Sequence, residues 1–338
     1  MTETTREIRL ASRPKGEPVA ENFELAETPL PEPGPGEVLV RNSYVSVDPY
    51  MRGRMRDAKS YVPPFQVGAV LQGGAVGQVV ASNGADLEEG AWVQSMDGWR
   101  EHYTSAGQGL LPVDPEVAPV STALGVLGMP GLTAWYGLTQ IGKPERDETV
   151  FVSAAAGAVG SVVGQLARLR GARAVGSAGS PEKVALLTGE LGFDAAFNYK
   201  TEDLNAALRE HCPNGIDVYF DNVGGDQLEA ALNRLNTFAR VPLCGMVSAY
   251  NLEQPAPGPR NLASLLVNRA TITGFIVTDH YDRFGEFIEE VGGHVRSGEL
   301  GYRETVVDGI ENMPQAFIGL MEGQNTGKML VRVGPDPA

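Results

Sequence analysis

The stretch TVFVSAAAGAVGSVVGQLA, residues 149–167, decides the fold. Residues 149–153 form an apolar run ahead of small residues and glycines, which is typical of a strand buried on both faces. A turn containing Gly157 and Gly160 follows, and Gly171 stands where a glycine commonly ends a helix. Between them, apolar side chains recur at helical spacing at Val159, Val162, Val163, Leu166 and Leu169. The stretch therefore predicts a buried strand, a glycine-rich turn and a helix.

The same alternation continues downstream. Residues 172–176 predict a second strand, and Ser180-Pro181-Glu182 is typical of a helix start, with an N-cap serine and a proline at the first helical position. We expect that helix to end near residues 191–192. Further short apolar runs at 216–220 and 239–243 predict more strands. Alternating strands and helices favour an α/β fold with a doubly wound parallel sheet.

The flanks differ in character. Short runs of β-forming residues lie between Gly/Pro clusters at 8–10, 37–40, 74–80 and 90–93, and this spacing predicts a β-rich domain. Strand-like runs return at 305–307 and 329–333, around a short helix at 314–322. We therefore expect a β-rich domain over 1–128, an inserted α/β domain over 129–304, and a return to the first domain over 305–338.

The glycine-rich turn predicts a dinucleotide site. Gly157 would let the backbone approach a pyrophosphate, and Gly160 would allow the helix to pack closely on the strand. The helix amino terminus offers N–H groups and a partial positive charge to the phosphates. Ala155 stands where the first glycine of the G-x-G-x-x-G pattern would be. The alternative is a tight turn without a ligand.

The end of the second strand favours NADPH over NADH. An NAD site usually carries Asp or Glu there to bind the ribose 2′-hydroxyl. This chain has Val175-Gly176-Ser177-Ala178-Gly179-Ser180, and no acid precedes Glu182. Lys183 follows, and Tyr199 stands further on, so a 2′-phosphate could be held. The alternative for Lys183 is a solvated lysine on a helix face. Asp221, Asn222, Gly224 and Gly225 follow another strand, at an edge where such sheets bind ligands.

Composition narrows the classes of function. The formal net charge of −15 and the lack of a Lys/Arg-rich run argue against nucleic acid as a partner. No apolar run reaches the length of a membrane helix, and the amino-terminal stretch lacks the apolar core of a secretion signal, so we expect a soluble cytoplasmic protein. Two cysteines and four scattered histidines make a zinc site improbable, so no metal is expected.

A nicotinamide enzyme without a metal is best suited to an activated bond. A C=C bond conjugated to a carbonyl accepts hydride at its β carbon while charge develops on the carbonyl oxygen. Such a reaction needs a hydrogen-bond donor and a proton source, and a tyrosine can serve as either.

Many segments resemble the zinc-free medium-chain dehydrogenase/reductases, specifically the alkenal/prostaglandin/curcumin reductase group. The resemblance spans nearly the whole chain and rests on VDPYMRGRM (47–55), PPFQVGAVLQGG (63–74), TALGVLGMPGLTAWYGL (122–138), AAGAVGSVVGQLA (155–167), GSPEKV (179–184), FNYK (197–200), FDNVGG (220–225), CGMVSAYN (244–251) and NTGK (325–328). It implies a Rossmann domain inserted in a GroES-like domain, NADPH as cofactor, and a homodimer. It implies cofactor contacts at Gly157, Ala158, Val159, Gly160, Ser161, Lys183, Tyr199, Asn222, Cys244, Gly245, Tyr250, Phe275, Val277 and Asn325.

The sequence thus predicts an NADPH-dependent reductase of α,β-unsaturated ketones or aldehydes, with a small-molecule enone as substrate. Tyr50 and Tyr250 are the candidate catalytic residues, and either could instead be a packed aromatic with a satisfied hydroxyl. Two alternatives stay open: an NADPH:quinone oxidoreductase, which the same architecture supports, and a non-catalytic NADPH-binding protein.

Overall fold

The structure is a computed structural model that describes residues 3–336. The chain divides into two compact units, Met1–Gly125 with Glu304–Ala338, and Val126–Arg303. Along the chain, the boundaries between the units are at 125/126 and 303/304, whereas the sequence predicted them at 128/129 and 304/305. Each unit is described by itself below.

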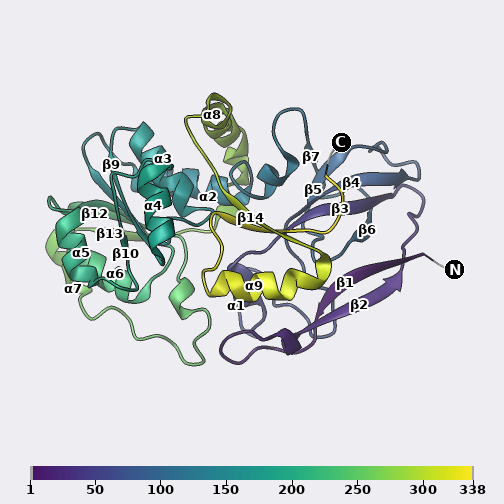
Figure 1. Cartoon of the computed structure of the whole chain (residues 1–338), viewed down its shortest axis with the longest axis horizontal. Helices are drawn as coiled ribbons and strands as arrows, with labels where there is room; N and C mark the ends of the chain where they lie inside the picture. Colours follow the sequence, from purple (N-terminus) through teal and green to yellow (C-terminus); the bar gives the residue numbers. More distant parts are fainter. Residues whose placement is uncertain (1–2, 337–338) are drawn as a thin grey trace. The chain divides into compact units, whose positions relative to one another are not determined.

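The inserted unit is built on a six-stranded parallel sheet (Figure 1). Its strands run in the order β10-β9-β8-β11-β12-β13. Their bounds are β8 Thr149–Val152, β9 Arg173–Ala178, β10 Ala195–Asn198, β11 Ile216–Phe220, β12 Leu235–Leu243 and β13 Thr271–Gly274. The order reverses between β8 and β11, which is the switch point where doubly wound sheets bind ligands. The predicted Rossmann sheet is confirmed.

Helices cover both faces of this sheet because neighbouring strand residues point to opposite sides. Val150 and Val152 of β8 belong to a core with α2, α3 and α8, whereas Phe151 belongs to a second core with α5 and α6. The helix bounds in this unit are α2 Met129–Tyr136, η3 Gly137–Gly142, α3 Gly160–Leu169, α4 Pro181–Gly189, α5 Leu204–His211, α6 Gly225–Leu232, η4 Val247–Ala249, α7 Ala263–Asn268, η5 Val277–Arg283 and α8 Phe284–Ser297.

Two element limits differ from the sequence analysis. α4 ends at Gly189, short of the expected 191–192. β12 begins at Leu235, four residues before the expected 239. Its register against β11 shifts in this part, and Phe238 has a left-handed φ of 64° and is 64% exposed. An irregular, exposed strand start lacks the continuous apolar run by which a buried strand is recognised.

The other unit is β-rich. Its strands are β1 Thr4–Leu10, β2 Phe23–Pro29, β3 Val38–Ser46, β4 Ala75–Ser82, β5 Trp92–Ser95, β6 His102–Ser105, β7 Leu111–Val113, β14 Glu304–Asp308 and β15 Lys328–Arg332. Its helices are η1 Ala20–Asn22, α1 Tyr50–Arg54, η2 Val120–Leu124, η6 Ile310–Asn312 and α9 Met313–Met321. The main sheet has the order β14-β15-β3-β4-β5-β7, and β6 also pairs with β3. The carboxy-terminal strands therefore rejoin the amino-terminal sheet, as the yellow and blue ribbons show (Figure 1).

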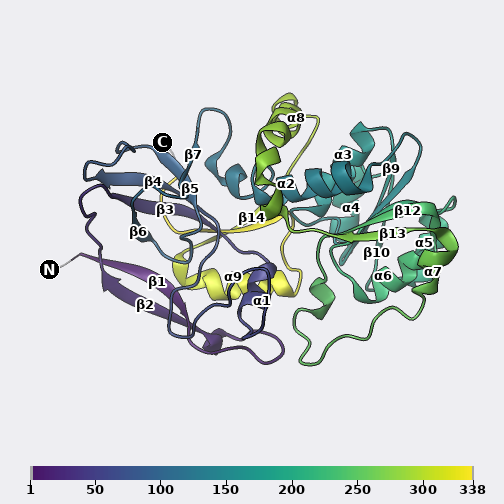
Figure 2. The same ribbon diagram turned by 180° about the vertical axis from the view of Figure 1, so that it is seen from behind.

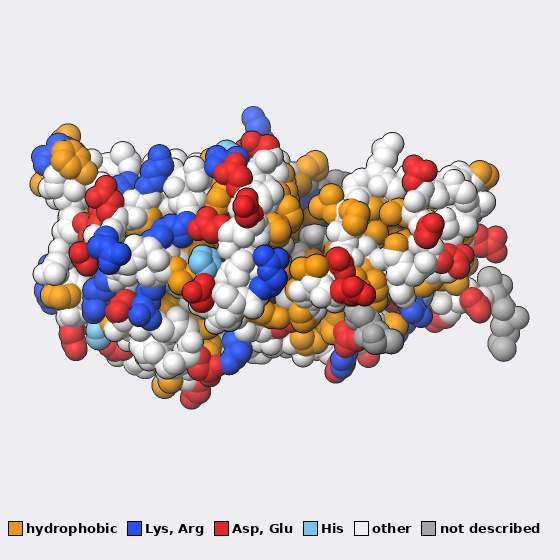
Figure 3. Space-filling model, turned by 90° about the horizontal axis from the view of Figure 1, so that it is seen from above, with side chains coloured by type: hydrophobic (Ala, Val, Ile, Leu, Met, Phe, Trp, Pro, Cys, Tyr) orange, Lys and Arg blue, Asp and Glu red, His pale blue; other side chains and the backbone are white. Residues whose placement is uncertain are grey.

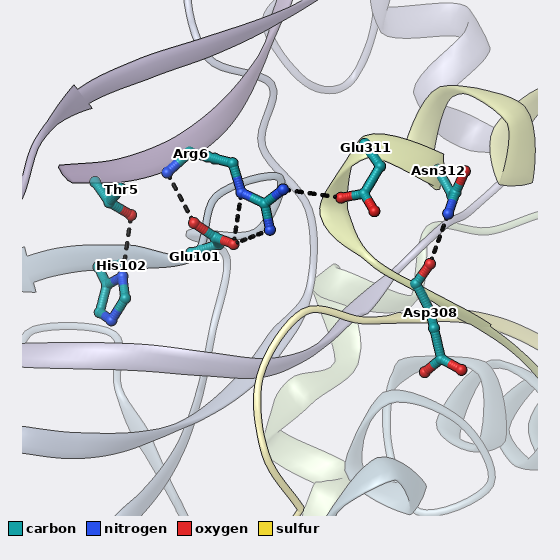
Figure 4. Close-up of polar contacts among 7 residues, drawn as sticks. All are labelled: Thr5, Arg6, Glu101, His102, Asp308, Glu311 and Asn312. Carbon is teal, nitrogen blue, oxygen red and sulfur yellow. Dashed lines mark hydrogen bonds and ion pairs between the residues drawn. The ribbon is translucent and has the colours of Figure 1, made fainter.

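One core joins the two ends of the chain in this unit. Met51 of α1 and Phe317 of α9 share it with Ile8 and Trp99, and α1 and α9 lie side by side in both views (Figure 2). Polar contacts add to this core (Figure 4). The Arg6 guanidinium donates to Glu101 at 2.6 Å and to Glu311 at 3.0 Å, joining β1 to the segment before β6 and to η6. These pairs are partly exposed, so the apolar core contributes more to stability.

Candidate active site

The predicted cofactor residues of the inserted unit follow the carboxyl ends of its parallel strands. Those ends meet at one edge of the sheet. Gly157, Ala158, Val159, Gly160 and Ser161 follow β8; Lys183 follows β9; Tyr199 follows β10; Asn222 follows β11; Cys244, Gly245 and Tyr250 follow β12; Phe275 and Val277 follow β13. The fold thus brings together residues that lie up to 120 positions apart (277 minus 157).

The turn after β8 has the close packing expected of a nucleotide turn. A Cβ on Gly160 would lie 2.5 Å from the Ala154 carbonyl oxygen, and one on Gly157 would lie 3.2 Å from it. Ala154 has a left-handed φ of 50°, and Ala155 is fully buried with its N–H donating to the Ser177 oxygen at 2.9 Å. No side chain caps the amino end of α3. The N–H groups of Ser161 and Val162 donate to the Gly157 and Val159 carbonyls at 3.1 Å each, so the attraction of this end for an anion comes mainly from the positive end of the helix dipole.

A cluster of cations lies at the end of β9. Lys183 is half-buried in the first turn of α4, where Ser180 caps the helix by accepting from the Lys183 N–H at 3.4 Å. Burial and the positive charge of Lys200 lower the pKa of Lys183. Lys200 and Tyr199 both pack on Gly179, since a Cβ there would lie 3.2 Å from Lys200 Cε and 3.3 Å from the Tyr199 hydroxyl. Lys200 was not among the residues predicted from the sequence, although its place directly after Tyr199 was an available signal.

The carboxylate of Asp221 organises the turn after β11. Asp221 is fully buried, and its Oδ1 accepts from the Tyr219 hydroxyl at 2.7 Å and from the N–H groups of Val223 and Gly224 at 2.9 and 2.8 Å. The Ser153 hydroxyl, at the end of β8, also donates to it at 3.2 Å. Burial raises the pKa of Asp221 despite these donors. The network fixes the backbone on both sides of the switch point.

The same network reaches the candidate residues around it. Asn222 donates its backbone N–H to the Ser153 hydroxyl at 3.0 Å and its side-chain Nδ2 to the Ser153 carbonyl at 2.8 Å. The N–H groups of Cys244 and Gly245 donate to the Asp221 carbonyl oxygen at 2.9 and 3.1 Å. The ends of β8, β11 and β12 are therefore joined by hydrogen bonds, and sequence reasoning had no signal for Ser153 in this role.

The segments after β12 and β13 are shaped by packing. A Cβ on Gly245 would lie 3.4 Å from the Tyr250 hydroxyl, so Tyr250 folds back over the turn. Burial and the nearby Asp221 raise the pKa of the Cys244 thiol to about 12, so this cysteine is a poor nucleophile at neutral pH. Phe275 packs at 5.8 Å, ring centre to ring centre, from Tyr136, and Val277 is buried.

Tyr50 and Asn325 belong to the β-rich unit. Tyr50 is the first residue of α1 and is half-buried, and Asn325 is buried and donates to the Gly327 carbonyl at 2.7 Å. The turn into α1 is held by the buried Lys328, whose Nζ donates to the Val47 carbonyl at 2.9 Å and pairs with Asp48 at 3.2 Å. A charge pair this deeply buried restricts the geometry of the turn because breaking it would leave one charge unpaired.

The distribution of charged and apolar side chains bears on other kinds of site. Acidic and basic side chains lie interspersed on the face seen in Figure 3. Within residues 3–336, no group of three or more His, Cys, Asp or Glu side chains is arranged to hold a metal ion. In the same part of the chain, every helix is too short or too polar to cross a membrane.

Comparison with known proteins gives the family. Residues 6–113 match a family described as the N-terminal domain of oxidoreductase, and residues 158–292 match one described as zinc-binding dehydrogenase. The NADPH-dependent curcumin reductase of Escherichia coli is 47% identical over 332 residues, covering 97% of this chain and 96% of that protein. The NADP⁺-dependent 2-alkenal reductase of Nicotiana tabacum is 42% identical over 337 residues, with 98% of each chain covered.

A solved structure of a similar protein has the same fold. CurA from Vibrio vulnificus in complex with NADPH superimposes with a TM-score of 0.93 at 47% identity, covering 98% of this chain and 99% of that one. The sequence matches and the fold, a Rossmann sheet inserted in a β-rich unit, indicate the same family. The chain belongs to the medium-chain dehydrogenase/reductase family, in its group of double-bond reductases.

Proposed function

We propose that this protein is an NADPH-dependent reductase of the C=C bond of α,β-unsaturated ketones or aldehydes. The observation that carries the proposal is the pair of lysines Lys183 and Lys200, with the phenol of Tyr199, at the end of β9. The chain is 47% and 42% identical to enzymes named curcumin reductase and 2-alkenal reductase. Two like charges held close together are mutually unfavourable, and a 2′-phosphate between them would offset that repulsion.

Most of the other proposed cofactor contacts follow the carboxyl ends of the parallel strands. The proposed pyrophosphate contacts are Gly157, Ala158, Val159, Gly160 and Ser161, because the glycines let a ligand approach the backbone and the positive end of the α3 dipole attracts an anion. The proposed contacts nearer the nicotinamide are Asn222, Cys244, Gly245, Tyr250, Phe275, Val277 and, from the β-rich unit, Asn325. The Asp221 network supports this assignment because it fixes the turns that carry Asn222 and Cys244.

When bound, NADPH supplies a hydride to the β carbon of the substrate. The C=C electron pair then moves toward the carbonyl, and an enolate forms. A protein hydroxyl that donates a hydrogen bond to the enolate oxygen would stabilise this charge. Addition of a proton to the α carbon, from such a hydroxyl or from water, then completes the reduction. We propose Tyr50 and Tyr250 for this donor role. Tyr50 begins α1, in a segment that resembles the family, and the Tyr250 hydroxyl lies near Gly245, a proposed cofactor contact.

A panel of electrophiles tests this function. The purified protein is given NADPH with linear and cyclic enones, alkenals and quinones, and cofactor oxidation is followed together with product identification. We expect saturated ketones or aldehydes and higher kcat/KM on enones than on quinones. Faster turnover of quinones would favour the quinone reductase alternative. Binding of NADPH without oxidation by any electrophile would favour a non-catalytic binding protein.

We also propose a homodimer that pairs the β13 edges of two copies. Among the described residues, β13 is an edge strand of the sheet and pairs with a strand, β12, on one side only. Large apolar side chains are exposed nearby: Leu266 is 82% exposed, Val267 is 70% exposed, and Phe238 lies under Arg269 at 4.9 Å. A two-fold axis at this edge would continue the sheet and cover those side chains.

The dimer has a direct test. Leu266→Asp places a charge in the proposed interface and should yield monomers in sedimentation at micromolar concentration, whereas Tyr61→Asp, at an exposed position in the other unit, should leave the dimer intact. Equal sedimentation masses for wild type and Leu266→Asp would contradict the proposed interface. The cytoplasm remains our proposed location, supported by the two free thiols Cys212 and Cys244, and cell fractionation tests it.

A further inference from the structure

A buried lysine joins the two segments of the β-rich unit that carry candidate site residues. Lys328 is the first residue of β15, and its side chain is 4% exposed. Its Nζ donates to the Met329 carbonyl at 2.7 Å and to the Val47 carbonyl at 2.9 Å, and it pairs with Asp48 Oδ1 at 3.2 Å. An ammonium group has three N–H donors, so these three acceptors use all of them.

Strand pairing explains why these groups meet. β15 pairs with β3 in antiparallel register, with Leu330 opposite Ser46. Continuing that register by two residues places Lys328 opposite Asp48, just beyond the end of β3. Asp48 is also held from its other side, because the Ser46 hydroxyl donates to its Oδ2. The ion pair therefore extends the contact between the two segments beyond the last residues that pair in the sheet.

Each segment carries a candidate site residue close to this ion pair. Tyr50 begins α1 two residues after Asp48, and the Asp48 carbonyl accepts from a backbone N–H in the first turn of that helix at 3.2 Å. Asn325 lies three residues before Lys328, and its side chain donates to the Gly327 carbonyl at 2.7 Å. The lysine thus connects the start of the helix that bears a proposed donor to the turn that bears a proposed cofactor contact.

The cost of burying this charge indicates that it does more than stabilise the sheet. The next residues of β15, Met329, Leu330 and Val331, are apolar and buried. Burial penalises the charged form of Lys328 and lowers its pKa. Apolar residues can often replace a buried ion pair without loss of stability. They cannot fix two segments in direction as well as distance, because that requires hydrogen bonds.

We propose that Lys328 is a positioning residue for Tyr50, anchoring the segment of the donor hydroxyl to the turn that carries Asn325. Lys328 acts through the backbone of residues 47–50 and does not touch the substrate. Hydride and proton add to neighbouring carbons of one C=C bond, so a displacement of about 1 Å between their sources would slow the reaction by up to about 10²-fold. The role rests on the proposed enone reduction with Tyr50 as a donor.

Two variants separate positioning from stability. Lys328→Met leaves the Asp48 carboxylate buried without its cation and should lower the melting temperature by about 5–10 °C. Adding Asp48→Asn removes that charge and keeps an acceptor for Ser46, so the double variant should regain much of the lost stability. We expect kcat for enone reduction to lie about tenfold or more below wild type in both, because neither restores the bonds that join the segments. Recovery of kcat together with the melting temperature would overturn the role.

A double-mutant cycle tests whether the effect acts through the tyrosine. In the Tyr50→Phe background, adding Asp48→Asn and Lys328→Met should lower kcat by less than about twofold further. The Kd for NADPH should stay within about threefold of wild type in all four proteins, because most of the proposed cofactor contacts belong to the inserted unit. Equal losses of kcat with and without the Tyr50 hydroxyl would overturn the role.

Hydrogen exchange of the protein without cofactor gives a readout that does not depend on turnover. Loss of the bonds from Lys328 should speed amide exchange at residues 47–55 and 325–329 by about fivefold or more in the variant that carries Asp48→Asn and Lys328→Met. Exchange in the inserted unit should remain as in wild type. Unchanged exchange in both segments would overturn the anchoring.

Arg240 provides the matched control in the inserted unit. Like Lys328, it donates to two backbone carbonyls, those of Gly142 at 2.8 Å and Lys143 at 2.9 Å, and it pairs with a carboxylate, Glu148. Glu148 precedes β8, whereas the candidate residues follow the strands of that sheet. The variant with Glu148→Gln and Arg240→Met should change the melting temperature and leave kcat within about twofold of wild type. A loss of kcat as large as that of the Lys328 variants would overturn a specific role for Lys328.

The two proposals fail in different ways. Wild-type protein that reduces no enone would overturn the proposed function. Wild-type protein that reduces enones, with a Tyr50→Phe variant of normal kcat, would keep the function and overturn the role of Lys328.

Discussion

Lys183 lies within electrostatic reach of Lys200, although the two residues come from different segments of the sheet edge. Lys183 is in the first turn of α4, Lys200 follows β10, and the charge of Lys200 helps to lower the pKa of Lys183. Tyr199 stands between them in sequence and packs on Gly179. An anion at this place would meet two ammonium groups and a phenol, which matches a ribose 2′-phosphate better than a 2′-hydroxyl.

Removing Lys183 should weaken NADPH binding specifically. A charge-assisted hydrogen bond to phosphate is worth about 1.5–3 kcal/mol, so Lys183→Ala should raise KM for NADPH by about tenfold or more. The phosphate is remote from the reacting carbons, and kcat should stay nearly unchanged. KM for NADH serves as the internal control and should not move. A variant that keeps the wild-type preference for NADPH would make Lys183 a surface residue.

Lys200→Ala should change the pH dependence of NADPH binding. The lysine contribution is present while Lys183 is protonated and is lost as pH rises through its lowered pKa. Without Lys200 the pKa of Lys183 should rise, so affinity should be lower at pH 7 but should persist to higher pH. Fluorescence titrations with NADPH and NADH between about pH 7 and 10 measure this. Parallel pH curves for wild type and variant would contradict the coupling.

Tyr50→Phe and Tyr250→Phe should separate the two candidate donors. A positioned donor or acid contributes about 10²-fold, so the variant lacking it should lose kcat by that factor or more. The other variant should keep most of its kcat and report only on packing. Near-normal kcat in both would assign the donor role to a ribose hydroxyl of the cofactor or to water.

Chelation should leave the activity unchanged. The sequence offers few Cys and His ligands, and no suitable cluster is found within residues 3–336. Overnight treatment with a strong chelator, followed by assay with NADPH and an enone, is expected to give the untreated rate. Activity that disappears and returns with added zinc would overturn the metal-free mechanism.

We expect Asp221 to stabilise the fold mainly as a hydrogen-bond acceptor and not through its negative charge. Asp221→Ala leaves the donors of Tyr219, Val223 and Gly224 without their buried acceptor and should cost about 3 kcal/mol. Asp221→Asn keeps an oxygen acceptor, so its melting temperature should fall less. Because the folded-state pKa of Asp221 is raised, the ionised form is less favourable in the folded protein, and stability from this group falls as pH rises through that pKa. Asp221→Asn should lack this dependence, whereas similar losses in both variants at every pH would contradict it.

Local sequence was sufficient to predict several elements of the inserted unit, whereas β10, β13 and the helices α5 to α8 were not predicted from it. The run at 149–153 and the helical spacing of Val162, Val163 and Leu166 correspond to β8 and α3. Ser180 and Pro181 begin α4 as expected. These features are predictable because the apolar pattern follows from burial of a strand on both faces and of a helix on one. Where that pattern is interrupted, as at Phe238 in β12, the prediction stopped short.

What only the tertiary structure decided is which distant side chains share a site. Lys200 meets Lys183 because β10 pairs with β9, and Ser153 meets Asp221 because β11 pairs with β8. Arg54 belongs to α1, but the groups that its guanidinium contacts, Phe65, Pro63 and Gln72, come from the segment that follows the helix. Strand pairing and burial set the electrostatics of each group, and both depend on contacts between residues far apart in the chain, which a local sequence pattern does not record.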